Sequence, residues 1–303
     1  MDKRKRSEIL CIKETVKSKK LDFSSFYTKN RHDYLNYCYF CQVNTLQKSL
    51  AYTRYLRKAR TKYYIHSPFV YQLCENVIFD KRHYYAFDEI EMRRAVLLNS
   101  KQMIEITDFG AGSTIFKDNK RKIGDLARYT ASSAKKGRLL FRLVNYFQPK
   151  NILELGTSLG ISTMYMAKAK KMANVHTIEG CKQTAAYAKQ SFEVMQLPNI
   201  TLHTARFEEV LPQLLPKINN LDVVFFDGNH RSEATRQYFK QCLPYFHNDT
   251  VLVLDDIHWS ADMEQFWQEI QQDEKVQISI DLFHIGLLFF RKEQAKEHFT
   301  LFF

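Results

Sequence analysis

The sequence has no long hydrophobic stretch. Crossing a lipid bilayer takes a run of about 18 or more apolar residues, and no such run occurs in the 303-residue chain, so we expect no membrane span. The basic residues 1–10 are not followed by the apolar segment of a secretory signal. The six cysteines are too sparse for a disulfide-stabilised scaffold. These absences predict a cytoplasmic protein.

Acidic residues are in the minority, and the resulting positive charge is unevenly spread. The chain has 45 Lys and Arg against 33 Asp and Glu, a net charge of +12. Residues 1–62 alone hold 16 Lys and Arg and 5 Asp and Glu, an excess of +11. Because the remaining residues are close to neutral, a nucleic-acid enzyme with a basic cleft is disfavoured. A basic N-terminal segment that contacts RNA, DNA or another anionic surface remains open.

The chain divides into three predicted regions. Residues 1–50 are Lys-rich and lack a helical or strand period, which is typical of a poorly ordered tail. Within this tail Cys38 and Cys41 have the spacing of zinc ligands, but no second Cys or His pair follows to complete a zinc site. We expect a helical cap at residues 51–136 and a main domain at residues 137–303.

The cap is predicted to consist of helices. Residues 51–62 interleave basic and aromatic side chains, as a basic amphipathic helix does. Ser67 and Pro68 have the residue types of an N-cap and a first helical residue. Further helices are expected at residues 87–102 and 115–129, and at 137–147 just before the main sheet. The stretch 108–113 contains a Gly-x-Gly pattern, but no strand that ends in an acidic residue follows it, so we interpret it as a loop.

From Asn151 onward, predicted strands and helices alternate. Strands are expected at residues 151–155, 174–179, 199–203, 221–227 and 250–255, and helices at residues 161–171, 181–195, 207–214, 231–246 and 260–272. Such alternation is typical of a parallel sheet with helices on both faces. Two last strands, at 276–283 and 286–291, have a very short connection and must pair antiparallel. The sequence thus predicts an α/β, Rossmann-like doubly wound sheet with a C-terminal antiparallel hairpin.

The stretch 151–163, Asn-Ile-Leu-Glu-Leu-Gly-Thr-Ser-Leu-Gly-Ile-Ser-Thr, is the expected ligand-binding turn. An apolar strand leads into a turn with Gly156 and Gly160, and a helix starts directly afterwards. At such a turn the backbone approaches a ligand closely, and the helix N-terminus offers N–H donors. A dinucleotide-binding turn needs glycine where Ser158 stands, so a cofactor with a pyrophosphate is disfavoured. Glu154, before the turn, suits a cationic ligand that carries an ammonium and a sulfonium.

This stretch resembles motif I of the class I S-adenosylmethionine-dependent methyltransferases, in the form found in their O-methyltransferase branch. The resemblance covers roughly residues 137–303, and segments 66–71 and 109–113 resemble the front part of a bacterial subgroup of unassigned substrate. In this family the acid at the position of Glu179 binds the ribose hydroxyls, and the segment after the third strand contacts adenine. The resemblance implies S-adenosyl-L-methionine as the cofactor, with these binding residues: Glu154, Gly156, Thr157, Ser158, Gly160, Ser162, Glu179, Ala205, Arg206, Phe207 and Asp227.

Two polar clusters are expected beside this turn. The fourth strand ends at Asp227, with His230 shortly after it, and the fifth strand leads into Asp256 and His258. Ligands of open α/β sheets bind outside the carboxyl ends of the strands, so we expect these four side chains to handle the acceptor. Consecutive strand residues face opposite ways, and of Asp255 and Asp256 we favour Asp256 as the one that faces the ligand.

Two catalytic schemes remain open. In one, His230 or His258 is the base, because the ordinary pKa of histidine lies near neutrality. In the other, Asp227 and Asp256 hold Mg²⁺, which would lower the pKa of the acceptor. The catechol-type O-methyltransferases hold magnesium through an Asp after the fourth strand and an Asp-Asn pair after the fifth, and here Ile257 replaces that Asn.

We therefore expect a methyltransferase that acts on a hydroxyl of a small-molecule acceptor. One alternative is an RNA or other nucleic-acid methyltransferase that uses the basic N-terminal segment, although no Asn-Pro-Pro-Tyr-type signature for the amino-methylation of bases occurs. Another is a catalytically silent module that only binds the cofactor. A homodimer is compatible with each of these hypotheses.

Overall fold

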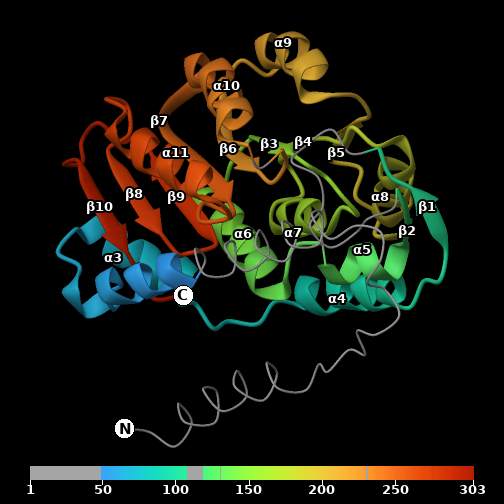
Figure 1. The fold of residues 1–303 in the computed structure, drawn as a ribbon, viewed down its shortest axis with the longest axis horizontal. Helices are drawn as coiled ribbons and strands as arrows, with labels where there is room; N and C mark the ends of the chain where they lie inside the picture. The colour runs from blue at the N-terminus through green and yellow to red at the C-terminus, as the bar shows by residue number, and fades with distance from the viewer. Residues whose placement is uncertain (1–48, 108–118, 130, 230) are drawn as a thin grey trace, which may run out of the picture. The chain divides into compact units, whose positions relative to one another are not determined.

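The computed structural model describes residues 49–107, 119–129, 131–229 and 231–303 (Figure 1). These residues belong to one compact unit, Lys48–Phe303. The boundary expected between cap and main domain falls inside this unit. Most of the predicted tail with its cysteine pair, the stretch 108–113 and His230 lie outside the described residues.

An eight-stranded sheet forms the centre of the molecule. Its strands are β3 (Asn151–Leu155), β4 (Asn174–Ile178), β5 (Ile200–His203), β6 (Leu221–Phe226), β7 (Phe246–Asp255), β8 (Ile278–Asp281), β9 (Ile285–Phe289) and β10 (Glu297–Thr300). They lie in the order β10-β8-β9-β7-β6-β3-β4-β5. Strands β3 to β7 run parallel, while β9 is antiparallel to both β7 and β8. The prediction of a mostly parallel sheet with a C-terminal antiparallel hairpin is confirmed.

Helices cover both sides of this sheet. They are α6 (Ala134–Phe147), α7 (Ile161–Ala169), α8 (Lys182–Val194), α9 (Phe207–Ile218), α10 (Ser232–Cys242) and α11 (Ala261–Gln272), with the short turn η3 (Leu243–Tyr245) after α10. Figure 1 shows α10 and α11 on one side of the sheet and α6 and α7 on the other. All the α-helices that the sequence predicts after Asn151 are present, with ends that agree to within a few residues.

The central strands are buried on both faces, which explains their continuous apolar runs. In β6, Val223 and Phe225 pack into the apolar cluster that includes α6 and α7. Val224 and Phe226 point the other way and pack into the cluster formed with α9, α10 and α11. Two packed faces hold the strands rigidly, so the residues that follow the strand ends are well placed for a binding site.

The cap region packs onto the side of the sheet that α6 and α7 cover. Ser67 accepts a hydrogen bond from the Val70 N–H (3.4 Å), so the predicted N-cap is confirmed. The elements of the cap are η1 (Lys62–Tyr64), α3 (Pro68–Leu73), the π-helical turn η2 (Cys74–Ile78), α4 (Tyr85–Leu98), β1 (Met103–Glu105), β2 (Lys120–Lys122) and α5 (Ile123–Tyr129). Residues 49–58 are also helical.

The helix predicted at residues 115–129 is wrong over residues 120–122. These residues form β2, which pairs antiparallel with β1 and places Arg121 opposite Ile104. Both of these side chains are buried, whereas their neighbours along each strand are exposed. A run of charged residues resembles a solvated helix locally, but here a distant segment supplies the strand partner. The cap therefore contains a small sheet in addition to helices.

The sequence pattern does not predict β10, which pairs parallel with β8. Directly after it, Leu301 forms a β-bridge with Arg60. The Tyr55 hydroxyl donates to the backbone oxygen of Leu301 at 2.5 Å. Residues 49–60 are thus fastened to the end of the chain by backbone and side-chain hydrogen bonds.

Within the described ranges, no helix is long and apolar enough to cross a membrane. Cys74, Cys181 and Cys242 are free and buried. Burial raises the pKa of Cys74 and that of Cys242 to about 12, so both are thiols at neutral pH. The cytoplasmic location stays a prediction.

Candidate functional site

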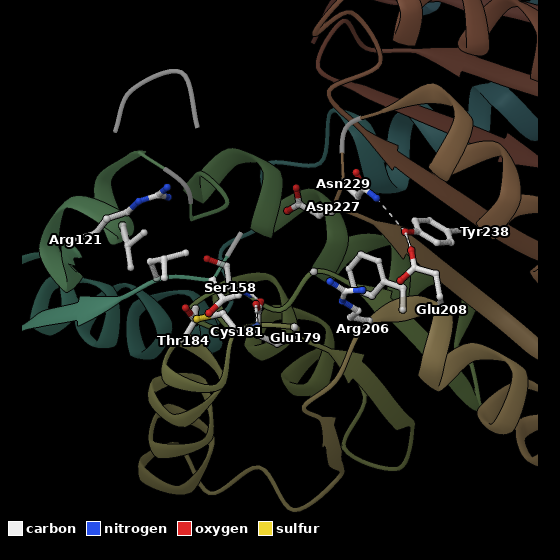
Figure 2. Close-up of a pocket in the computed structure, with 17 residues that line it drawn as sticks. Arg121, Ser158, Glu179, Cys181, Thr184, Arg206, Glu208, Asp227, Asn229 and Tyr238 are labelled. Carbon is white, nitrogen blue, oxygen red and sulfur yellow. Dashed lines mark hydrogen bonds between the residues drawn. The ribbon is translucent and has the colours of Figure 1, made fainter. Parts of the chain in front are cut away.

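A cavity of about 220 Å³ lies at the carboxyl ends of the parallel strands. Residues that follow β3, β4, β5 and β6 all border it, as expected for a ligand site in an open α/β sheet. Figure 2 shows Ser158 and Glu179 in the middle, Arg121 at one end, and Arg206, Glu208 and Tyr238 at the other. The lining comprises Gly156, Ser158, Glu179, Gly180, Cys181, Thr184, Arg206, Phe207, Glu208, Asp227, Gly228, Asn229 and Tyr238, with Ile106, Thr107, Arg121 and Leu126 from the cap.

The turn after β3 depends on glycine. Gly156 has a φ of +99°, and a Cβ atom there would lie 2.3 Å from the backbone oxygen of Asp227. A Cβ at Gly160, whose φ is +79°, would lie 2.5 Å from the ring of Phe192. Ser158 also has a positive φ of 49°, which is uncommon for a residue with a side chain. The chain thus turns tightly here, with its backbone against the cavity and against the end of β6.

Glu179 connects this turn to the end of β4. Its Oε2 accepts a hydrogen bond from the Ser158 N–H (2.8 Å), and its Oε1 accepts one from the Cys181 N–H (2.9 Å). Cys181 is the N-cap of α8. The carboxylate is therefore held by two backbone donors at the cavity wall, in a fixed orientation.

Glu154 lies beneath the turn and not at the cavity. Its side chain is fully buried and accepts hydrogen bonds from the hydroxyls of Ser162, Thr163 and Thr177. Burial raises its pKa to about 7, although the three hydroxyls act in the opposite direction. These contacts fasten β3 to β4 and to the first turn of α7. Of the other predicted cofactor residues, Thr157, Gly160, Ser162 and Ala205 also do not border the cavity.

The segment after β5 forms one end of the cavity. Arg206 and Phe207 line it, and the ring of Phe207 meets that of Tyr238 edge-on, with centroids 5.4 Å apart. The Tyr238 hydroxyl donates to Glu208 Oε1 (2.5 Å) and accepts from the Asn229 side-chain amide (3.0 Å). The sequence reasoning missed these last three residues, because their connection depends on how α9 and α10 pack.

Beside the cavity lies a buried group of charges around Asp227. Its Oδ2 accepts a hydrogen bond from the Ser132 hydroxyl (3.2 Å) and lies 3.8 Å from the Lys136 ammonium. The same ammonium donates to Asp255 Oδ2 at 2.5 Å. Burial raises the pKa of Asp227 well above its ordinary value, and Asp255 raises it further, while Lys136 lowers it. The structure thus brings together two strand-end carboxylates and one lysine.

Asp256 and His258 do not border the cavity. Asp256 turns away from the strand with a φ of 51°, and its N–H donates to the backbone oxygen of His284 (2.6 Å). His258 Nε2 lies 2.9 Å from Asp281 Oδ2, and its ring stacks on Phe283 with centroids 5.2 Å apart. Asp255, not Asp256, is the residue that reaches the ammonium next to Asp227.

Lys136 and Arg121 are the cationic residues that sequence reasoning missed at this site. Lys136 lies in the first turn of α6, where a positive charge is opposed by the helix dipole. A lysine at that position is a signal that a negative partner is present elsewhere in the fold. Arg121 carried no such signal, since it reaches the cavity through the pairing of β1 with β2.

Across residues 49–107, 119–129, 131–229 and 231–303, no group of three or more His, Cys, Asp or Glu side chains is arranged to hold a metal ion. The Lys136 nitrogen lies 3.8 Å from Asp227 Oδ2 and 2.5 Å from Asp255 Oδ2.

Comparisons with known proteins agree with this architecture. Residues 153–257 match the family model of a methyltransferase domain. A catechol O-methyltransferase of Niastella koreensis is 31% identical over 128 residues, which are 41% of this chain and 57% of that protein. The chain thus spans little more than half the length of this relative.

Solved structures share the fold. The O-methyltransferase TomG of Streptomyces achromogenes, solved in complex with SAM, aligns with a TM-score of 0.50 and 20% identity over 73% of this chain and 95% of its own. An O-methyltransferase of Bacillus cereus, solved in complex with SAH, aligns with a TM-score of 0.50 and 19% identity over 73% and 97%.

The matched residues include most of the site described above. Residues 153–257 include the glycine turn, Glu179, and the strand-end carboxylates Asp227 and Asp255. Residues 153–257 thus carry a methyltransferase domain, and a catechol O-methyltransferase is among the relatives of this chain.

Proposed function

We propose that this protein transfers a methyl group from S-adenosylmethionine to a hydroxyl of a small-molecule acceptor. The observation that carries the proposal is the cavity in which the glycine turn, Glu179 and Asp227 meet. A backbone turn, a ribose-binding acid and a carboxylate beside the reacting groups are the parts that such a transfer needs. The catechol O-methyltransferase among the relatives supports the same reaction class.

The residues at the cavity fit this cofactor. At Gly156 a side chain would collide with Asp227, so the backbone alone faces the ligand there. Glu179, held by two N–H donors, is placed to accept hydrogen bonds from the ribose hydroxyls. Phe207 and Arg206 line the cavity and are the residues that we propose to contact the adenine. The bound cofactor supplies a methyl group activated by the positive charge on sulfur.

Asp227 is the proposed proton acceptor. Its side chain is 15% exposed and borders the cavity, and burial raises its pKa above the ordinary value of a carboxyl. The acceptor oxygen bonds to the methyl carbon while the sulfur–methyl bond breaks and its electron pair stays on sulfur. The hydroxyl proton passes to Asp227. His230 and His258 remain the alternative bases that the sequence suggests.

The space between the Asp227 and Asp255 carboxylates does not fit the predicted Mg²⁺. A positively charged nitrogen already lies 2.5 Å from one of these carboxylates and 3.8 Å from the other. Asp256, the second predicted ligand, does not border the cavity. We therefore include no magnesium in the proposed reaction.

A small acceptor is favoured over RNA by the charges at the cavity. Its lining contains the carboxylates of Glu179, Glu208 and Asp227, against the guanidinium groups of Arg121 and Arg206. Such a lining offers a phosphate backbone no net attraction. RNA binding that weakens steeply with salt and is lost when residues 1–62 are deleted would instead favour the nucleic-acid alternative.

Calorimetric titration of the full chain with S-adenosylmethionine and S-adenosylhomocysteine tests the proposal. We expect micromolar binding by the native chain and at least about a tenfold loss in Glu179→Ala. Glu193→Ala is the matched control, because Glu193 is exposed near the end of α8 and lies outside the cavity. Absence of binding by the native chain, or equal binding by the two variants, would overturn the cofactor assignment. Assays of hydroxylated acceptors with the radiolabelled methyl donor then test the transfer.

A further inference from the structure

Lys136 lies at a junction of three elements. It belongs to the first turn of α6, and its ammonium contacts Asp255 at the end of β7 and Asp227 directly after β6. These two strands are parallel neighbours, with Phe226 paired to Leu254, so the two aspartates that follow them are adjacent. The lysine side chain is only 17% exposed and that of Asp255 only 2%.

The two buried carboxylates need a neighbouring positive charge. Two buried carboxylates at neighbouring strand ends repel each other, and removing them from water is costly. The start of a helix is also an unfavourable place for a cation. The Lys136 nitrogen lies 2.5 Å from Asp255 Oδ2 and 3.8 Å from Asp227 Oδ2, so its positive charge faces both carboxylates.

We propose that the Lys136 ammonium is this enzyme's own cation at the place where catechol-type O-methyltransferases hold magnesium, between an Asp after the fourth parallel strand and an Asp after the fifth. This inference rests on the proposed methyl transfer. The ammonium balances the two carboxylates and lies next to the cavity wall at Asp227, where it stabilises negative charge that develops on the acceptor oxygen. It keeps its proton throughout the reaction. Methyl transfer then needs no divalent cation.

The type of cation at this place also predicts which acceptors the enzyme can use. A divalent metal accepts two adjacent oxygens of one ligand as coordinating groups, whereas an ammonium donates single hydrogen bonds. The native enzyme is therefore expected to accept molecules with one hydroxyl as readily as those with two adjacent hydroxyls. A catechol and its single-hydroxyl counterpart are the matched pair for this comparison.

The decisive experiment measures Mn²⁺ binding by electron paramagnetic resonance, with the full chain freed of metals. The native chain is expected to bind Mn²⁺ only weakly, in the millimolar range. Lys136→Met keeps the size of the side chain but removes its charge, so this variant is expected to bind one Mn²⁺ at least about tenfold more tightly. A further Asp255→Asn change should abolish the gain. Lys168→Met is the control, because Lys168 pairs with Glu89 outside the cavity.

Two results would overturn the inference. One is tight, stoichiometric Mn²⁺ binding by the native chain that disappears in Asp255→Asn. The other is a folded Lys136→Met variant whose Mn²⁺ affinity equals that of the native chain. If Lys136→Met does not fold, the Mn²⁺ titration of the native chain alone tests the inference. None of these measurements requires an acceptor, so a failure of the proposed methyl transfer, seen by calorimetry and radiolabel assay, is distinguished from a failure of the lysine assignment.

Discussion

The backbone N–H of Ser158 donates a 2.8 Å hydrogen bond to Oε2 of Glu179, which joins the turn after β3 to the end of β4 through a carboxylate at the cavity wall. The bond fixes the side chain that is proposed to hold the ribose while the backbone beside it stays open to the ligand. Its geometry depends on the positive φ of Ser158 and on the glycine two residues earlier.

Gly156→Ala is expected to disrupt the turn. The new methyl group would lie 2.3 Å from the Asp227 oxygen, at a φ of +99° that alanine rarely adopts. We expect a loss of about 2 kcal/mol or more in the free energy of unfolding, measured with urea, and a loss of cofactor binding measured by calorimetry. Asn219→Gly, at another positive φ of 64° outside the cavity, should instead be neutral or slightly stabilising. Normal stability and binding in Gly156→Ala would contradict the described turn.

The buried Glu154 carboxyl should make the free energy of unfolding depend on pH. Its pKa is about 7 in the folded chain, against an ordinary value of 4.5. Below pH 4.5 the carboxyl is protonated in both states, whereas between pH 4.5 and 7 only the unfolded chain releases the proton. Stability should therefore fall as pH rises through this window, by at most about 3 kcal/mol.

Glu154→Gln should remove that fall in stability. Urea unfolding at pH 5, 6, 7 and 8 measures the effect, and Glu193→Gln on the exposed face of α8 is the control, which should keep the native pH profile. An unchanged slope in Glu154→Gln would show that this carboxyl does not hold its proton in the folded chain.

Tyr238→Phe removes the hydroxyl that links Glu208 to Asn229, at the end of the cavity that is proposed to hold the adenine. The ring contact with Phe207 is kept, so only the polar connection is lost. We expect the affinity for S-adenosylhomocysteine to fall by roughly fivefold, which corresponds to about 1 kcal/mol. Tyr245→Phe, outside the cavity lining, should not change the affinity. Equal affinity in both variants would place the adenine elsewhere.

His258→Ala separates a catalytic from a structural role for this histidine. The ring contacts Asp281 and Phe283 and does not border the cavity, so its removal should lower stability by about 1–2 kcal/mol. The turnover number of the purified variant, measured by the radiolabel assay below its melting temperature, should stay within about threefold of the native value. A fall of about a hundredfold would be the size expected for a general base and would restore the catalytic role.

The sequence alone determined the parallel sheet, its terminal hairpin and the position of the glycine turn after the first of these strands. Those features depend on patterns between near neighbours: an apolar run such as 221–226, a glycine where the backbone must turn, and a capping serine such as Ser67. Each of these patterns spans only a few neighbouring residues, so it is visible in the sequence before its packing partner is known.

Only the tertiary structure decided which charges meet. Lys136 and Asp255 are 119 residues apart in the chain, and their contact depends on how α6 packs against β7. The strand at residues 120–122 likewise requires β1 as a partner. Glu154 has the residue type of a ligand contact, yet three hydroxyls enclose it below the turn. Long-range packing sets burial, and burial determines whether a charged side chain binds a ligand, holds the fold together or serves as the partner of another charge.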